Sequence, residues 1–142
     1  MDCTMKKEEL ISMLRKNGHK VTPQRLAICE EVLFSEKHPN AEMIFEKVSK
    51  QHPGLSMTTV YHTLDMLKKM ELVQEIRFDN RTSRFDPNTS VHVNIICQKC
   101  GKISDFESDA LQKHWSSIVS ELEVKPIGQR LDVYVICDDC EK

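Results

Sequence analysis

Two pairs of cysteines carry the clearest chemical signal in this chain. Cys97 and Cys100 are separated by two residues, Cys137 and Cys140 are spaced in the same way, and 36 residues lie between the pairs. Two intervening residues allow both sulfurs of a tight turn to reach one ion, and two such turns complete the tetrahedral thiolate shell that zinc prefers. We therefore expect one structural zinc ion per subunit, joining two ends of a small domain.

Paired cysteines also occur in disulfides and in redox-active dithiols, so these remain alternatives to zinc. No secretory signal is recognised in the sequence, and reducing compartments disfavour structural disulfides. We accordingly expect a cytoplasmic protein. No apolar run approaches the length that spans a membrane, so no membrane partner is expected.

The charge of the chain is distributed unevenly. The formal net charge is −2 over 142 residues, but residues 1–85 carry a net +2 and residues 86–142 a net −4. This modest asymmetry permits DNA binding by the first half without demonstrating it. The length suits one ordinary domain or two small ones.

The first half of the sequence predicts short helices with recognisable starts. Leu10, Ile11 and Leu14 mark an amphipathic helix that ends near Gly18. Three later helices are expected to begin after residues whose side chains cap a helix, one of them followed by a proline at the first helical position. These capping residues are Thr22, Asn40 and Ser56.

The helix after Ser56 and the segment that follows it predict a winged helix-turn-helix. Its outer face is polar and flanked by an aromatic residue, as suits a recognition helix in the major groove, although a solvated helix in a generic bundle has the same pattern. Residues 72–78 and 82–85 predict two strands joined by a turn, which would form the wing. Arg77, Arg81 and Arg84 lie where a wing would contact phosphate or the minor groove.

The second half predicts a small β-β-α-β unit. Strands are expected over 91–96, 103–106 and 131–136, with His92 and Asn94 on one face of the first. Ser108 caps a helix with an apolar stripe made of Leu111, Trp115, Ile118, Val119 and Leu122. A unit of under 60 residues is too small to be very stable by itself, so zinc and an oligomeric interface would both stabilise it. The predicted fold class is α+β, with a winged helix-turn-helix followed by a zinc-stapled α/β domain.

At this point the chain resembles the ferric uptake regulator (Fur) family of metal-dependent repressors, over nearly its whole length. The similarity is carried by the segments Val21-Thr22-Pro23-Gln24-Arg25, His38-Pro39-Asn40-Ala41, Thr58-Thr59-Val60-Tyr61, Ser83-Arg84-Phe85-Asp86 and Cys97-x-x-Cys100-Gly101-Lys102. Within the family it is most similar to the peroxide-sensing repressors, because Asp86 and Asp105 stand where those sensors have aspartate and iron sensors commonly have glutamate.

The resemblance implies a domain organisation and partners. It implies a winged-helix DNA-binding domain over 1–85, a hinge over 86–90 and a dimerisation domain over 91–142. It further implies a homodimer that binds a pseudo-palindromic double-stranded DNA operator. The residues expected to contact DNA are Tyr61, with its neighbours Thr58, Thr59 and His62, and Lys20 and Arg25 as phosphate or minor-groove partners.

The resemblance also implies a regulatory Fe²⁺ or Mn²⁺ ion, one per subunit, that bridges the two domains. Its expected ligands are His38, Asp86, His92, Asn94 and Asp105. In the peroxide sensors, bound Fe²⁺ reacts with peroxide and a ligating histidine is oxidised, which releases metal and DNA; His38 and His92 match those histidines. Such self-oxidation is stoichiometric, so no enzyme activity is expected.

Asn94 is a departure from the family pattern, which usually has a second histidine at this position. An amide oxygen binds hard cations but is neutral and a poorer ligand than imidazole for Fe²⁺ or Zn²⁺. Either Asn94 ligates weakly, or four ligands and water hold the metal, or metal sensing is weakened. We favour a functional, retuned site.

Three other functions remain open on the sequence. The first is an iron, manganese or zinc uptake regulator without peroxide sensing. The second is a constitutive, zinc-stapled DNA-binding module. The third is a small redox protein that uses the cysteine pairs, which would leave the helix-turn-helix and the wing unexplained.

Overall fold

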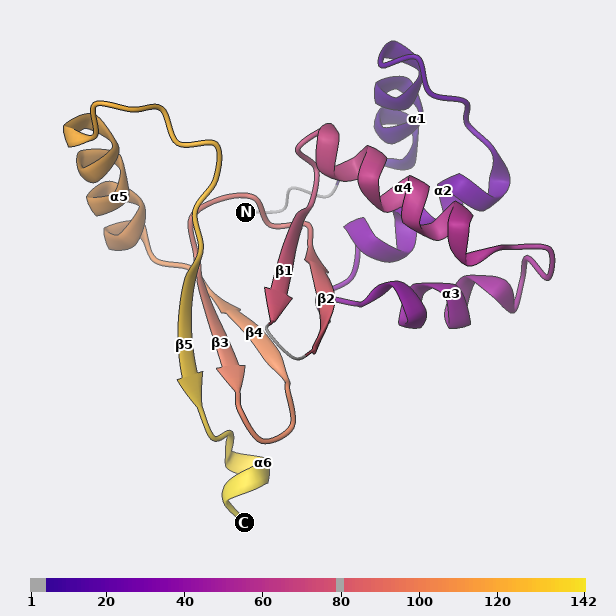
Figure 1. Cartoon of the computed structure of the whole chain (residues 1–142). Helices are drawn as coiled ribbons and strands as arrows, with labels where there is room; N and C mark the ends of the chain where they lie inside the picture. Colours follow the sequence, from indigo (N-terminus) through magenta and orange to yellow (C-terminus); the bar gives the residue numbers. More distant parts are fainter. Residues whose placement is uncertain (1–4, 79–80) are drawn as a thin grey trace. The chain divides into compact units, whose positions relative to one another are not determined.

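The computed structural model describes residues 5–78 and 81–142. The chain divides into a first unit, Met1–Thr89, and a second unit, Ser90–Lys142. In the first unit, helices precede a β-hairpin (Figure 1). These elements are α1 (Lys7–Lys16), α2 (Pro23–Leu33), α3 (Ala41–Ser49), α4 (Met57–Lys69), β1 (Gln74–Phe78) and β2 (Arg81–Asp86).

The predicted capping residues start the helices of the first unit. The side chain of Thr22 accepts a hydrogen bond from the backbone N–H of Arg25, and Pro23 is the first residue of α2. Asn40 caps α3 and Ser56 caps α4 in the same way, at 2.8 Å and 3.1 Å. Each cap satisfies a backbone donor that the helix itself leaves unpaired, so these local signals define the helix starts.

The core of the first unit brings the helices and the hairpin together. Ile28 and Val32 of α2 are fully buried with Leu64 and Leu67 of α4, and Phe85 of β2 belongs to the same cluster. The hairpin is antiparallel, with Ile76 opposite Arg84, and its register shifts between Ile76 and Phe78. Helices followed by an antiparallel hairpin make this unit the predicted winged helix.

The second unit, all of whose residues are described, is built on a small mixed sheet of order β4-β3-β5. Its central strand pairs antiparallel with β4 and parallel with β5. The elements are β3 (Val93–Cys97), β4 (Ile103–Phe106), α5 (Asp109–Glu121), β5 (Leu131–Val135) and α6 (Asp138–Glu141).

The helix α5 has the predicted apolar stripe, but this stripe is left accessible to solvent. None of the described residues 109–121 is buried, and Ile118 is 47 % exposed. On β5, Val133 and Tyr134 are about half exposed as well, at 48 % and 56 %. The small core of this unit lies along β3 and β4, where Ile96, Cys97 and Ile103 are buried.

Candidate metal centres and DNA-binding surface

The four predicted zinc cysteines lie together at one end of the sheet in the second unit. Cys97 ends β3, Cys100 lies in the turn after it, Cys137 follows β5 and Cys140 is in α6. Their sulfur atoms all lie within 4.8 Å of one another, and the Sγ atoms of Cys100 and Cys137 are 3.8 Å apart. Zinc–sulfur bonds of about 2.3 Å in a tetrahedron place sulfurs about 3.8 Å apart, so the cluster has the dimensions of a zinc site.

Backbone donors prepare this cluster to hold a cation. Hydrogen bonds from the backbone N–H groups of Cys100 and Cys137 lower the pKa of Cys97 to about 6. Side-chain hydrogen bonds to Cys137 and Cys100 raise the pKa of Cys140 to about 12. Zinc binds cysteine as the thiolate, so zinc binding releases thiol protons. The buried Cys29 of α2 takes no part, and burial raises its pKa to about 12.

In the first unit, His38 and Asp86 form a buried pair. The Nε2 atom of His38 lies 3.1 Å from Oδ2 of Asp86, and the two residues are 2 % and 1 % exposed. The other carboxylate oxygen of Asp86 accepts a hydrogen bond from the backbone N–H of Asn88. An imidazole and a carboxylate meeting in a buried position are two ligands of the type that Fe²⁺ and Mn²⁺ bind.

Arg84 holds the loop that presents His38. Its guanidinium donates hydrogen bonds to the backbone carbonyls of Lys37 (2.8 Å) and His38. The backbone N–H of Phe85 adds a bond to the carbonyl of Pro39, at 3.0 Å. His38 has a φ of 50°, in the left-handed region that residues with a Cβ rarely adopt, and such a conformation persists only where neighbouring contacts enforce it.

Arg84 has a partner within its own unit. The sequence places it where a wing could touch phosphate or the minor groove, and in the structure its half-buried guanidinium contacts the loop of residues 37 and 38. Arg77, by contrast, is exposed and donates a hydrogen bond to Glu75 of the same strand. The side chain of Arg81 lies outside the described residues.

In the second unit, His92, Asn94 and Asp105 converge on one point. The Nε2 atom of His92 lies 3.0 Å from Oδ1 of Asn94 and 3.5 Å from Oδ1 of Asp105. Asn94 and Asp105 are paired across β3 and β4, and His92 precedes β3 on the same face as Asn94. Because the Nδ1–H of His92 donates to the carbonyl of Ser90 (2.8 Å), the neutral ring presents a lone pair at Nε2. A nitrogen lone pair and two oxygens this close together form a set of donor atoms that a cation can bind.

Asp132, which the sequence analysis did not single out, holds the other end of Asn94. The Nδ2 group of Asn94 donates a hydrogen bond of 3.1 Å to Oδ1 of Asp132 on β5. The alternation of Arg130, Asp132 and Tyr134 along one face of a strand is visible in the sequence. Asn94, the partner of Asp132, however, lies 38 residues away, and the parallel pairing of β3 with β5 brings the two together.

The predicted DNA-contacting residues of α4 lie on its solvent-facing side. Thr58, Tyr61 and His62 are exposed, and Tyr61 is 49 % exposed despite its aromatic ring. Thr59 is half-buried, and its side chain shares a hydrogen bond of 2.9 Å with that of Ser56. An exposed tyrosine between polar residues on a helix is a suitable surface for base edges in a groove.

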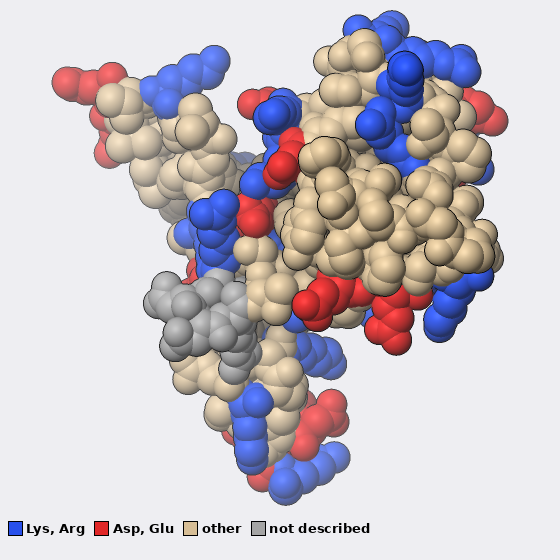
Figure 2. Space-filling view, turned by 45° about the vertical axis from the view of Figure 1, so that its right-hand side comes forward, with Lys and Arg blue, Asp and Glu red and all other residues tan. Residues whose placement is uncertain are grey.

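Basic residues lie near the start of the same unit. Lys20 is exposed, and the guanidinium of Arg25 donates a 2.7 Å hydrogen bond to the backbone carbonyl of Lys20. Figure 2 shows Lys and Arg side chains gathered over the end of the first unit that contains α1. Such a surface is suited to phosphate contacts, which position a protein on DNA without reading its sequence.

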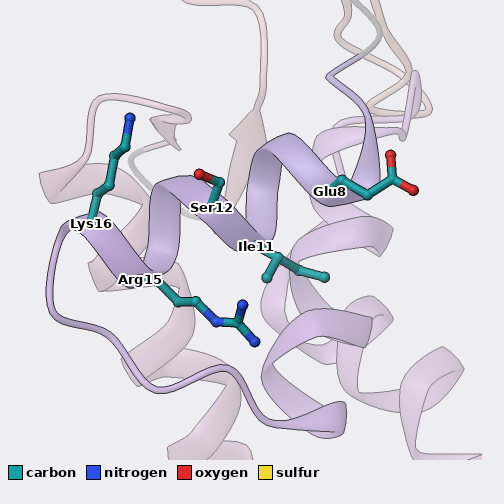
Figure 3. A pocket seen from close by; sticks show the side chains of 5 residues that line it. All are labelled: Glu8, Ile11, Ser12, Arg15 and Lys16. Carbon is teal, nitrogen blue, oxygen red and sulfur yellow. The ribbon is translucent and has the colours of Figure 1, made fainter.

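A shallow groove on α1 has no comparable chemistry. Its lining comes from α1 alone, with Lys16 and Ser12 pointing away from Ile11 and Arg15 (Figure 3). No set of ligand or catalytic side chains converges among the described residues that line it.

Among residues 5–78 and 81–142, no helix is long and apolar enough to cross a membrane.

Comparisons with known proteins agree with this geometry. The sequence profile of the ferric uptake regulator family matches residues 16–134. The chain is 38 % identical over 141 residues to the peroxide-responsive repressor PerR of Staphylococcus epidermidis, covering 95 % of this chain and 90 % of that protein.

Solved structures have the same fold. The Campylobacter jejuni peroxide stress regulator superposes with a TM-score of 0.73 at 30 % identity, over 93 % of this chain and 99 % of that chain. The Helicobacter pylori ferric uptake regulator has a TM-score of 0.79 at 24 % identity, over 100 % and 98 %. These likenesses confirm the predicted fold class. The chain belongs to the ferric uptake regulator family of metal-dependent transcriptional repressors.

Proposed function

We propose that this protein is a repressor whose DNA binding is controlled by one divalent cation per subunit. The proposed ligands are His38 and Asp86 from the first unit and His92, Asn94 and Asp105 from the second. The observation that carries the proposal is the convergence of His92 Nε2 with the oxygens of Asn94 and Asp105, at 3.0 Å and 3.5 Å. The cysteine cluster would hold a separate, structural zinc.

The proposed ligand set favours Fe²⁺ or Mn²⁺. Two imidazoles, two carboxylates and one amide oxygen form a mixed nitrogen and oxygen site, whereas the four thiolates form the softer site that suits zinc. The Nδ1–H group of His92 donates a hydrogen bond of 2.8 Å to the carbonyl of Ser90, and this bond leaves Nε2 as the ring nitrogen that would face the cation. The two centres therefore differ in ligand chemistry, and each would select its own metal.

Regulation would follow from the division of the ligands between two units. A cation that contacts both His38–Asp86 and His92–Asn94–Asp105 binds more tightly to the arrangement of units that brings the two sets together. Binding shifts the population towards that arrangement only by this differential affinity. We propose that this arrangement is the one competent to bind DNA.

Peroxide sensing is the specific form of regulation that we propose. It is supported by the similarity to PerR of S. epidermidis and to the peroxide stress regulator of C. jejuni. Bound Fe²⁺ supplies one-electron reducing chemistry towards peroxide, which Mn²⁺ does not. The net change on the protein is that a C–H bond of the His38 or His92 ring becomes a C–O bond. One oxygen atom of hydrogen peroxide enters the ring and the other leaves as water, so the chain is consumed once and is not an enzyme.

Asn94 favours a second candidate, a manganese-responsive repressor that ignores peroxide. Its side chain offers a neutral oxygen where the family usually has a histidine nitrogen, and oxygen ligands suit Mn²⁺. In that case the same ligands and the same DNA surface are used, but His38 and His92 remain unmodified. The two candidates differ only in the response of the iron-loaded protein to peroxide.

The DNA-binding surface that we propose is the outer face of α4. Tyr61, Thr58, Thr59 and His62 would face base edges in the major groove, since a recognition helix presents its exposed side there. Lys20 and Arg25 would contact phosphate or the minor groove. The first domain, residues 1–85, would thus bind DNA, and residues 86–90 would serve as the hinge.

The remaining domain, residues 91–142, would form a homodimer. The exposed apolar side chains of α5 and β5, including Ile118 at 47 % and Val133 at 48 %, support this proposal. A two-fold dimer matches a pseudo-palindromic operator, because each subunit reads one half-site. We propose that the protein acts in the cytoplasm, where its operator DNA lies.

The test is DNA binding as a function of Mn²⁺. DNA would be selected from a random pool with Mn²⁺-loaded protein, and affinity would be measured by fluorescence anisotropy for His38→Ala, His92→Ala and the control His52→Ala. We expect Mn²⁺ to strengthen binding by the unmodified protein and by His52→Ala, but not by the other two variants. DNA affinity that is indifferent to Mn²⁺ would instead indicate a constitutive, zinc-stapled DNA-binding module.

A further inference from the structure

The side-chain amide of Asn94 has two chemically different ends, and Asp132 faces one of them. The Nδ2 atom lies 3.1 Å from Oδ1 of Asp132, and the Oδ1 atom lies 3.0 Å from Nε2 of His92. A carboxylate only accepts hydrogen bonds, so the NH₂ group must point towards Asp132. The amide oxygen is thereby directed at His92 and Asp105.

The reverse orientation of the Asn94 amide would prevent a cation from binding between His92 and Asn94. It would place the oxygen of Asn94 against the Asp132 carboxylate, where two acceptors repel each other. It would also direct an N–H group at Nε2 of His92, where it would occupy the lone pair that a cation needs. Asn94 is therefore an oxygen ligand in one orientation and an obstruction in the other.

Asp132 is itself held firmly in place. Arg130 contacts both of its carboxylate oxygens, Nε to Oδ1 at 3.0 Å and one terminal nitrogen to Oδ2 at 2.7 Å. The hydroxyl of Tyr134 donates a further hydrogen bond to Oδ2, at 3.3 Å. Asp132 and Tyr134 alternate along β5, so they share one face of the sheet, and Asp132 lies directly opposite Asn94 in the parallel pairing with β3.

We propose that Asp132 is a positioning residue that makes Asn94 an oxygen ligand of the regulatory cation. The carboxylate fixes the amide so that the ligand set contains an oxygen where the family usually has a histidine nitrogen. Oxygen ligands suit Mn²⁺, whereas imidazole suits Fe²⁺ and Zn²⁺, so Asp132 also contributes to metal preference. This inference rests on the proposed function, because it requires that Asn94 contact the cation.

The experiment is a double-mutant cycle read out by Mn²⁺ affinity. The full-length, zinc-loaded protein would be compared with Asp132→Asn, Asn94→Ala and the double variant. Asp132→Asn keeps the shape of the side chain but lets the two amides pair in either orientation. Dissociation constants would come from titration calorimetry and from the electron paramagnetic resonance signal of free Mn²⁺.

We expect Asp132→Asn to weaken Mn²⁺ binding about tenfold, as is typical when a group that orients a metal ligand is removed. Asn94→Ala should weaken it as well. In the Asn94→Ala background, Asp132→Asn should have little further effect, because no amide remains to be oriented and the charge of Asp132 is already paired with Arg130. Zinc content and circular dichroism would verify that every variant is folded.

The outcomes separate this inference from the proposed function. If Asn94→Ala weakens Mn²⁺ binding and Asp132→Asn does not, Asp132 does not orient Asn94, and the inference is overturned. The proposed ligand set would then stay intact. An equal loss on Asp132→Asn in both backgrounds would mean that Asp132 only supports the sheet, which also overturns the inference. If Asn94→Ala binds Mn²⁺ with unchanged affinity, Asn94 is not a ligand. The proposed role of Asn94 as a ligand and the proposed role of Asp132 in orienting it would then both be wrong.

Discussion

Arg84 and Asp132 make contacts in the structure that the sequence alone does not predict. Both contact proposed ligand residues, or the loop that carries one, from far away along the chain: Arg84 contacts the loop of His38, and Asp132 contacts Asn94. Ligand residues in metal sites are usually held by such outer partners, which fix the orientation of each donor atom. The chemistry proposed here therefore depends on at least two residues that do not contact the metal.

The role of Arg84 leads to a prediction about metal affinity. Replacing Arg84 with Gln removes the paired hydrogen bonds to the carbonyls of residues 37 and 38, so the left-handed conformation of His38 loses its support. We expect Mn²⁺ to bind about tenfold more weakly, measured by calorimetry. Arg15→Gln on α1 is the control and should bind Mn²⁺ normally. Equal affinities for the two variants would show that Arg84 does not position His38.

The proximity of His92 and Asn94 could be predicted from the sequence, but the groups that hold the proposed ligands in place could not. His92 and Asn94 are two residues apart in a predicted strand, so their common face follows from the alternation of side chains. Asp132 lies 38 residues from Asn94, and Arg84 lies 46 residues from His38. Contacts at such separations depend on strand pairing and on loop packing, which no local pattern specifies.

At the scale of elements, the recognition helix combines a buried face with an accessible one. Val60, Leu64 and Leu67 of α4 are buried, whereas Tyr61 and His62 are exposed. The helix start is fixed by the Ser56 cap, whose side chain accepts from the N–H of Thr59 at 3.1 Å. A helix anchored in this way can present one aromatic ring to DNA without weakening the core.

This arrangement predicts a specific effect of removing the Tyr61 ring. Tyr61→Ala should weaken binding to the selected DNA by about 1–3 kcal/mol and relax its sequence preference, as for other residues that face base edges. Phe34→Ala is a matched control, because Phe34 is 45 % exposed and Tyr61 is 49 % exposed. Thermal melting should change little in both variants. Similar DNA affinity for the two would place the DNA surface elsewhere.

The helix starts were well predicted because capping is a local property. Thr22, Asn40, Ser56 and Ser108 all accept hydrogen bonds from backbone donors three residues ahead. The stripe on α5 was predicted as well, yet none of the described residues 109–121 is buried. Periodicity identifies an apolar face, but it does not say whether the partner belongs to the same chain.

At the scale of the whole molecule, the two units differ in how they are stabilised. The first unit has a core of buried aliphatic side chains that joins its helices to the hairpin. The second unit buries few apolar residues, so the cysteine cluster at the end of its sheet must contribute more of its stability. Structural zinc sites supply about 10–16 kcal/mol in small domains, which is enough to decide whether such a unit folds.

We therefore predict that loss of zinc unfolds the second unit selectively. Cys97→Ser should lose its zinc, and amide hydrogen exchange should become fast over residues 90–142 while α2 and α4 stay protected. Cys29→Ala is the control, since Cys29 and Cys97 are equally buried but Cys29 lies in the first core. It should retain one zinc per chain, measured by atomic emission. Retention of zinc by Cys97→Ser would contradict the four-cysteine site.

Our proposed function requires that a metal site containing Asn94 link peroxide to DNA binding. The most direct measurement is DNA affinity of anaerobically purified protein, loaded with Fe²⁺ or with Mn²⁺, before and after one equivalent of hydrogen peroxide, with peptide mass spectrometry of the same samples. We predict loss of binding only in the Fe²⁺ sample, with one oxygen added to the peptide that carries His38 or His92. Metal-dependent binding that survives peroxide in both samples, with no added oxygen, would contradict it and leave a metal-responsive repressor without peroxide sensing.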